Sequence, residues 1–102
     1  FKFSDLCEGP RSQLDYIEIA CLFHTVFVSG VPEMNEIKKD VTRRFISMVD
    51  EFYDQGVKLI MSAEVPIENF NCEGSLSGEF QRTKSRLIEM QSHKYLSRGH
   101  RC

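Results

Sequence analysis

The 102-residue sequence lacks the features of membrane-spanning and of disordered proteins. It has no tryptophan and three prolines, and no apolar run approaches the roughly 18 residues that span a bilayer, which excludes a membrane-spanning helix. Hydrophobic residues make up 41% of the chain, among them eight phenylalanines, and this is too much apolar bulk for a disordered chain. Residues 1–102 are therefore expected to form a single domain.

The motifs that would let the chain do chemistry by itself are also absent. There is no GxxxxGK[ST] or GxGxxG run to hold a phosphate, and no GxSxG turn around a serine. Ser62 and His24 could form a nucleophile and its base, but no motif joins them. We therefore expect no catalytic residue in this chain and no ATP or Mg²⁺ bound by it alone.

Cysteine is too sparse for a scaffold held by disulfides. No two of the four cysteines form a CxxC pair, and none has a histidine at zinc-finger spacing. The pattern favours free thiols in an intracellular reducing compartment and no metal site, with a metal held by His100 and Cys102 as the alternative. The four cysteines are Cys7, Cys21, Cys72 and Cys102.

The net charge of -2 conceals two regions of opposite sign. Residues 1–81 carry seven basic and 14 acidic residues, whereas residues 82–102 carry six basic residues and one acidic residue. A basic end of this kind either attracts an acidic surface or is simply a solvated helix face. Tyr95 alone among the aromatics lies between the basic residues, so nucleic acid is not expected as a partner.

The apolar pattern predicts alternating strands and helices. Strands are expected at 1–6, 25–28 and 57–61, and helices at 13–23, 35–55 and 80–96. The run at 25–28 is continuously apolar after Thr25, which is typical of a strand buried on both faces, and 57–61 is expected to be a second buried strand. The order β-α-β-α-β-α predicts an α/β fold with a small three-stranded, mostly parallel sheet and flanking helices.

The helix predicted at 35–55 carries the first candidate functional residues. Asn35 can cap its start, and Gly56 follows its end. At about 100° per residue, Arg43 points away from the apolar face, and Arg44 lies at the edge of that face. Asp40 is spaced to pair with either arginine.

The last predicted helix, 80–96, repeats this geometry. Arg82 and Arg86 lie on one stripe with Glu89, and Glu89 is spaced to pair with Arg86. Outward arginines on both helices suit contact with a partner surface or a phosphate, and the alternative is ordinary ion pairing on the helix surface.

Short motifs follow one another in order along nearly the whole chain. They are Phe1-x-Phe3-x-Asp5-Leu6-Cys7, Asp15-Tyr16-x-x-Ile19-Ala20, Phe23-His24-Thr25-Val26-Phe27, Val31-Pro32, Asp40-x-x-Arg43-Arg44-Phe45-Ile46, Asp50-x-x-Tyr53-Asp54-x-x-Val57-Lys58-Leu59, Ser62-Ala63-x-x-Pro66 and Arg82-Thr83-x-Ser85-Arg86-Leu87-x-Glu89-Met90-Gln91-Ser92-x-x-Tyr95-Leu96. Together they resemble the C-terminal portion of the AFG/LACE-type AAA+ ATPases, which include the lactation-elevated proteins of mitochondria and bacterial ZapE. The loop at 67–79 departs from that pattern, because Asn69-Phe70 replaces a common Leu-Tyr pair.

The resemblance implies a longer parent protein, of which this chain is the C-terminal segment lacking the P-loop core; a first residue other than Met, Phe1, agrees with this. The parent would bind ATP and Mg²⁺, hydrolyse ATP, and act in mitochondrial protein quality control or, in bacteria, at the division site. Its expected partners are the remainder of its own chain, further copies of itself and protein substrates.

In rings of AAA+ subunits, an arginine of one subunit stabilises charge on its neighbour's nucleotide. The resemblance makes subunit contact or this role in trans the expectation for Arg43, Arg44, Arg82 and Arg86, with Asp40 and Glu89 in support. The alternative is a non-enzymatic interaction module whose basic C-terminal helix binds an acidic protein partner.

Overall fold

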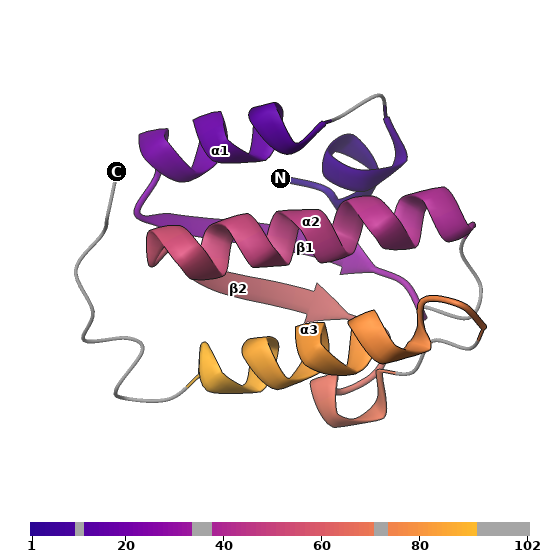
Figure 1. Ribbon diagram of the computed structural model, residues 1–102. Coiled ribbons are helices and arrows are strands. Elements are labelled where there is room, and N and C mark those ends of the chain that lie inside the picture. The colour runs from indigo at the N-terminus through magenta and orange to yellow at the C-terminus, as the bar shows by residue number, and fades with distance from the viewer. Residues whose placement is uncertain (10–11, 34–37, 71–73, 92–102) are drawn as a thin grey trace.

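Among the residues that the structure describes, the fold is a two-stranded parallel sheet with three α-helices on one side of it (Figure 1). In this computed structural model, residues 1–9, 12–33, 38–70 and 74–91 are described. The strands are β1 (Thr25–Val31) and β2 (Lys58–Ala63). The helices are α1 (Gln13–Leu22), α2 (Lys39–Gln55) and α3 (Ser77–Glu89), with two short helices, η1 (Ser4–Glu8) and η3 (Ile67–Asn69). The predicted α/β class is confirmed.

The strand predicted at residues 1–6 is wrong, so the sheet has two strands within the described residues rather than three. The chain makes one parallel bridge between Lys2 and Ser29 and then turns into the π-helix η1. The apolar residues here also have helical spacing, at i, i+3 and i+4, so one turn of helix buries them all. The side chains buried by this turn are Phe3, Leu6 and Cys7.

Helix α2 matches the clearest prediction of the sequence. It begins at Lys39 rather than at Asn35, which lies outside the described residues. It ends where expected, because Gly56 has the left-handed conformation (φ 73°) and its amide donates to the Phe52 and Tyr53 carbonyls. Its apolar face is buried along its whole length, through Val41, Phe45, Ile46, Met48, Val49 and Phe52.

Helices α1 and α3 also correspond to predicted helices. Helix α1 is within one residue of the prediction, and Asp15 accepts a hydrogen bond from the backbone amide of Ser12 at 2.8 Å to cap its start. Helix α3 begins three residues before the predicted Phe80, and residues 92–96 of the prediction lie outside the described residues. Ile88, an apolar residue on this helix, is 47% exposed.

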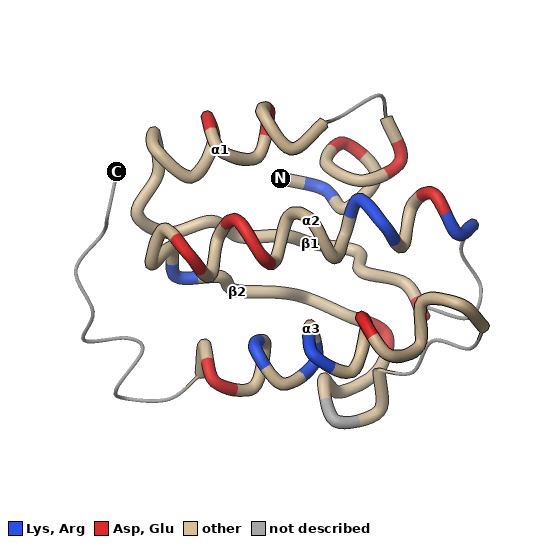
Figure 2. Tube along the Cα trace, viewed as in Figure 1, with Lys and Arg blue, Asp and Glu red and all other residues tan. Residues whose placement is uncertain are grey.

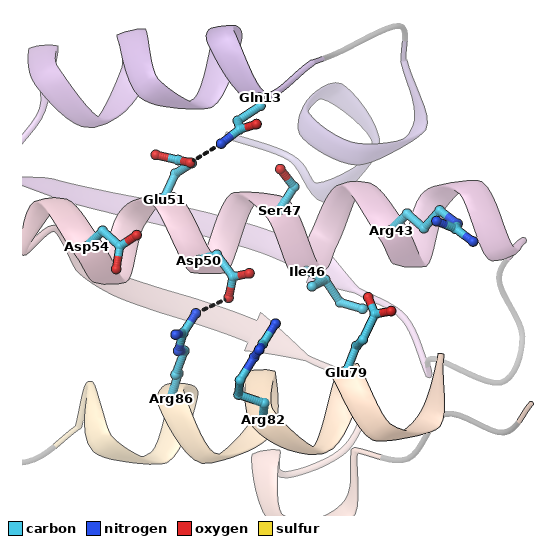
Figure 3. Close-up of a pocket in the computed structure, with 10 residues that line it drawn as sticks. All are labelled: Gln13, Arg43, Ile46, Ser47, Asp50, Glu51, Asp54, Glu79, Arg82 and Arg86. Carbon is cyan, nitrogen blue, oxygen red and sulfur yellow. Dashed lines mark hydrogen bonds and ion pairs between the residues drawn. The ribbon is translucent and has the colours of Figure 1, made fainter. Parts of the chain in front are cut away.

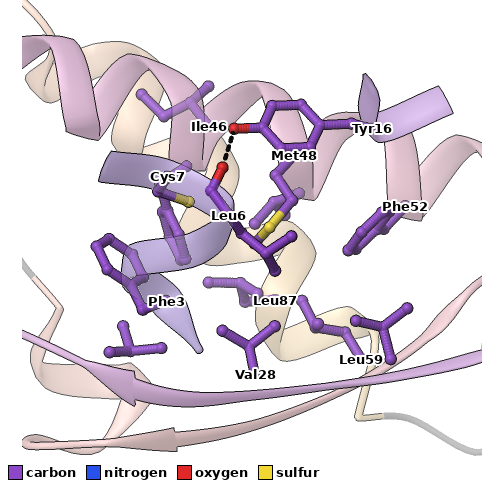
Figure 4. Close-up of a cluster of buried hydrophobic side chains, with 14 of the residues drawn as sticks. Phe3, Leu6, Cys7, Tyr16, Val28, Ile46, Met48, Phe52, Leu59 and Leu87 are labelled. Atoms are coloured by element: carbon purple, nitrogen blue, oxygen red, sulfur yellow. Dashed lines mark hydrogen bonds between the residues drawn. The ribbon is translucent and has the colours of Figure 1, made fainter. Parts of the chain in front are cut away.

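The strands are buried on one face, which corrects the prediction of burial on both. The inward side chains Val26, Val28 and Leu59 are at most 4% exposed. Their outward neighbours Phe27 and Ile60 are each 51% exposed. Figure 4 shows the buried side chains between the two layers, with the sheet on one side of the cluster and the helices on the other. The apolar side chains of the strands are therefore only partly covered by the described residues.

An aromatic core fills the space between α2 and the sheet. The ring of Phe45 lies 5.9 Å from that of Phe3 and 6.3 Å from that of Phe80, centroid to centroid. The hydroxyl of Tyr16, which is fully buried, donates to the Leu6 carbonyl at 2.7 Å (Figure 4). Helices α1 and α3 and the turn η1 are thus held to α2 and the sheet by one shared cluster.

Two further expectations concern cysteine and membranes. Cys7 is a free, buried thiol, but Cys21 is disulfide-bonded, so the prediction of free thiols is wrong for Cys21. Disulfide pairing depends on two sulfur atoms meeting in the fold, which spacing along the chain does not reveal. Among the described residues, no helix combines the length and apolar character needed to cross a membrane.

Candidate functional site

Helices α2 and α3 lie against each other and run in the same direction (Figure 1). Two contacts between them join residues 36 positions apart, Asp50 with Arg86 and Tyr53 with Glu89. This constant offset is what parallel helices in register produce, since each turn of one meets the matching turn of the other. We call these four residues the α2–α3 seam.

Arg86 is held from two directions in the seam. Its Nη1 donates to Oδ1 of Asp50 at 2.5 Å, with the two side chains 28% and 26% exposed. The carbon of its guanidinium group lies 5.0 Å from the centre of the Tyr53 ring, in cation–π geometry. The Tyr53 hydroxyl in turn donates to Glu89. Arg86 therefore joins α3 to α2, and its charge is already compensated.

The expected pairing of Arg86 with Glu89 does not occur, because both residues have other partners. Spacing within one helix reveals partners three or four residues away, but it cannot reveal a carboxylate on a second helix. Asp50 is seven residues after Arg43, about two turns of helix, so the two residues lie on the same side of α2. The sequence contained no signal that this side faces α3.

A groove of about 460 Å³ opens beside the seam, between α1, α2 and α3 (Figure 3). Acidic residues gather along the second half of α2 and basic residues along the middle of α3 (Figure 2). The groove is lined by Gln13, Arg43, Ile46, Ser47, Asp50, Glu51, Asp54, Glu79, Arg82 and Arg86. It brings together three of the four arginines predicted from the sequence.

Arg43 and Arg82 are the groove arginines without a fixed partner. Both are exposed, and within the described part of the chain neither forms an ion pair or a side-chain hydrogen bond. The groove also holds four carboxylates, of which Glu51 accepts a hydrogen bond from Gln13 at 2.6 Å. Four carboxylates against three guanidinium groups give mixed charge with a slight negative excess. Such a lining suits a protein surface of mixed charge better than a lone polyphosphate.

Arg44 and Asp40 do not belong to the groove. Nη1 of Arg44 donates to the Cys7 carbonyl at 3.1 Å, so this arginine fastens η1 to α2. Asp40 is exposed, and the described residues include no ion pair between it and Arg43 or Arg44. The expected position of Arg44, with its stem packed at the edge of the apolar face, is consistent with this inward contact.

Among the described residues, Ser62 and His24 do not form the nucleophile–base pair considered in the sequence analysis. His24 precedes β1 at its amino end and Ser62 is near the carboxyl end of the parallel neighbour β2, so the two lie at opposite ends of the sheet. Burial raises the pKa of the Cys7 thiol from 9.0 to about 12, which keeps it protonated and unreactive. No group of three His, Cys, Asp or Glu residues in the described ranges is placed to hold a metal ion.

The fold and the site define an α/β unit whose groove is lined by three arginines and four carboxylates, and comparison with known proteins gives its family. A family model described as AFG1-like ATPase matches residues 1–99. The chain therefore belongs to the AFG1-like ATPase family, as the order of motifs in the sequence indicates.

Two relatives show the range of the family. The cell division protein ZapE of Escherichia coli K12 is 51% identical over 98 residues, covering 96% of this chain and 26% of ZapE. The lactation elevated protein 1 homolog B of Danio rerio is 34% identical over 131 residues, covering 97% of this chain and 26% of that protein. The chain thus spans about a quarter of the length of these relatives. No solved structure matches it.

Proposed function

We propose that this chain is the C-terminal segment of an AFG1-like ATPase and that it provides a contact surface to the assembled enzyme. Binding of ATP and Mg²⁺ and hydrolysis are assigned to the rest of the polypeptide. Family membership and the absence of a GxxxxGK[ST] motif from the 102 residues support this division of labour. The mixed charge of the groove, with its carboxylates close to the arginines, also argues against a nucleotide held by this segment.

The observation that carries the proposal is the contrast between the groove arginines. Arg86 is paired with Asp50, whereas Arg43 and Arg82 line the same groove, are exposed and form no ion pair among the described residues. An exposed arginine without an ion pair has its planar set of donors available to a second surface, although fixing its side chain there has an entropic cost. We assign Arg43 and Arg82 to contact with a neighbouring subunit, including the role in trans on its nucleotide. Arg44 and Arg86 are assigned to the structure of the segment itself.

The test uses the full-length ATPase and replaces Arg43 or Arg82 by alanine. A residue that acts in trans on nucleotide is expected to lower kcat by about a thousandfold with little change in KM. A residue that only holds subunits together is expected to weaken assembly by about tenfold, which corresponds to about 1.4 kcal/mol. Steady-state ATPase kinetics and sedimentation velocity separate the two results.

Lys39→Ala is the matched control, because Lys39 is an exposed cation on α2 outside the groove. It should change neither turnover nor assembly. If Arg43→Ala and Arg82→Ala both behave like Lys39→Ala, the groove is not a subunit contact and the proposal is wrong.

The cellular role of the parent is proposed from its relatives. The resemblance to the lactation-elevated proteins supports the mitochondrial location and the quality-control role expected above. The identity of 51% to a cell division protein, against 34% to the animal relative, favours a role in bacterial cell division. Expression of the full-length gene in an Escherichia coli strain lacking ZapE tests this. Restored division supports it, and import of the protein into mitochondria without such rescue supports the other role.

A stand-alone module that binds an acidic partner through its basic last helix is the second candidate. Its support is the run of Arg82, Lys84 and Arg86 on α3. The engagement of Arg86 by Asp50 removes one of these charges from the surface, which weakens this alternative.

A further inference from the structure

The outer face of the sheet carries two large exposed apolar side chains, Phe27 and Ile60, among the polar residues Thr25, Lys58 and Ser62, and no helix of the described residues covers it. Phe27 on β1 and Ile60 on β2 are partners in the parallel register, so their side chains lie next to each other on this face. Each is 51% exposed. The three helices lie on the opposite face (Figures 1 and 4).

Parallel sheets are rarely left bare on one side. Their strands are normally covered on both faces and read as continuous apolar runs for that reason. Thr25-Val26-Phe27-Val28 is such a run after Thr25, and Val57-Lys58-Leu59-Ile60-Met61 is apolar except for Lys58. Val26, Val28, Val57 and Leu59 are buried in the core of this chain, whereas Phe27 and Ile60 point outward.

The edge of the sheet is open as well. Within the described residues β2 has a strand neighbour only in β1, so the backbone groups along its other edge have no strand partner. At an open edge a further strand can pair with the sheet, and a second layer of structure can pack on the open face beside it. Most sheets in globular proteins also have about four to six strands, so a sheet of two strands is small.

We propose that the rest of the AFG1-like ATPase polypeptide packs on this outer face, with Phe27 and Ile60 at the centre of the contact. About three-quarters of the length of ZapE and of the Danio rerio relative has no counterpart in these 102 residues, so a parent of similar length has ample further chain to cover this face. The inference rests on the proposed function in one respect, namely that the chain is a segment of a longer ATPase. It makes no use of the groove arginines.

Hydroxyl-radical footprinting of the full-length ATPase tests the proposal without any substitution. Two matched pairs serve as internal controls, Phe27 with Phe23 (51% and 43% exposed) and Ile60 with Ile88 (51% and 47% exposed). If the face is covered, Phe27 and Ile60 should be oxidised about fivefold more slowly than their matched residues, because burial removes their contact with solvent. Equal oxidation within both pairs would overturn the proposal.

Two arms identify what covers the face. Protection that persists when the protein is diluted to monomers comes from its own chain and supports the proposal, whereas protection lost on dilution comes from a second copy and contradicts it. Protection lost when residues 92–102 are deleted from the full-length protein would assign the cover to that segment and also contradict it.

The footprint is also independent of the test of the proposed function. Loss of turnover in Arg82→Ala with an exposed Phe27 would refute this inference alone. A protected Phe27 with normal turnover in both arginine variants would refute the groove contact alone.

Discussion

The two sides of helix α2 differ in kind. Its inner side packs aromatic and aliphatic side chains against the sheet, with Phe45 between the rings of Phe3 and Phe80. Its outer side carries the carboxylates that meet α3 in the seam and line the groove. Apolar side chains that are buried away from solvent contribute much more to the free energy of unfolding than ion pairs that are partly exposed. The inner side should therefore determine stability, and the outer side should determine what the segment contacts.

The largest effect expected from this difference is at Phe45, which is fully buried. Phe45→Ala removes a ring that contacts two other aromatic rings and leaves a cavity, so we expect a loss of about 3–5 kcal/mol in the free energy of unfolding. Urea denaturation followed by circular dichroism measures it. Ile88→Ala, at a half-exposed position on α3, is the control and should cost under about 1 kcal/mol. Similar losses in both variants would break the comparison.

A smaller effect is expected when only a hydroxyl is removed, at Tyr16 in the core or Tyr53 in the seam. Tyr16→Phe leaves the Leu6 carbonyl without its buried donor, so we expect a loss of about 1–3 kcal/mol. Tyr53→Phe removes a hydrogen bond to Glu89 that is open to solvent, where water can replace the hydroxyl, and should cost less than about 1 kcal/mol. The same denaturation measurement compares the two. A larger loss at Tyr53 would show that the seam hydrogen bond contributes more to stability than the buried one, and would contradict the comparison.

The inner side of α2 was predictable from the sequence, because burial follows a local period. Val41, Phe45, Met48 and Phe52 repeat at helical spacing, and each is buried. The same rule, applied to Phe3, Leu6 and Cys7, would have found η1. The alternation of apolar and polar residues at 1–6 indicated a strand instead, and tertiary packing decided between two patterns that a run of six residues cannot separate.

The outer side was predictable only in part. Helical geometry placed Arg43, Arg82 and Arg86 outward, and all three line the groove. Their partners were not predictable, because the pairing of Arg86 with Asp50 depends on α3 lying parallel to α2 at an offset of 36 residues. That offset is a property of the packed helices and of the strand β2 between them, not of either helix alone.

The smallest effect expected is the interaction between Arg86 and Asp50, measured by a double-mutant cycle with Arg86→Ala, Asp50→Ala and both together. The side chains are about one-quarter exposed, so solvent weakens their attraction, and each also loses conformational freedom when paired. We expect a coupling energy of about 0.5–1 kcal/mol in the free energy of unfolding, decreasing as salt is added. Arg86→Ala should cost more than this coupling, because it also removes the contact of the guanidinium with the Tyr53 ring. A coupling of about 3 kcal/mol or more that does not respond to salt would mean that the seam behaves as a buried ion pair. The outer side of α2 would then contribute to stability on the scale of the core, and the division between its two sides would no longer hold.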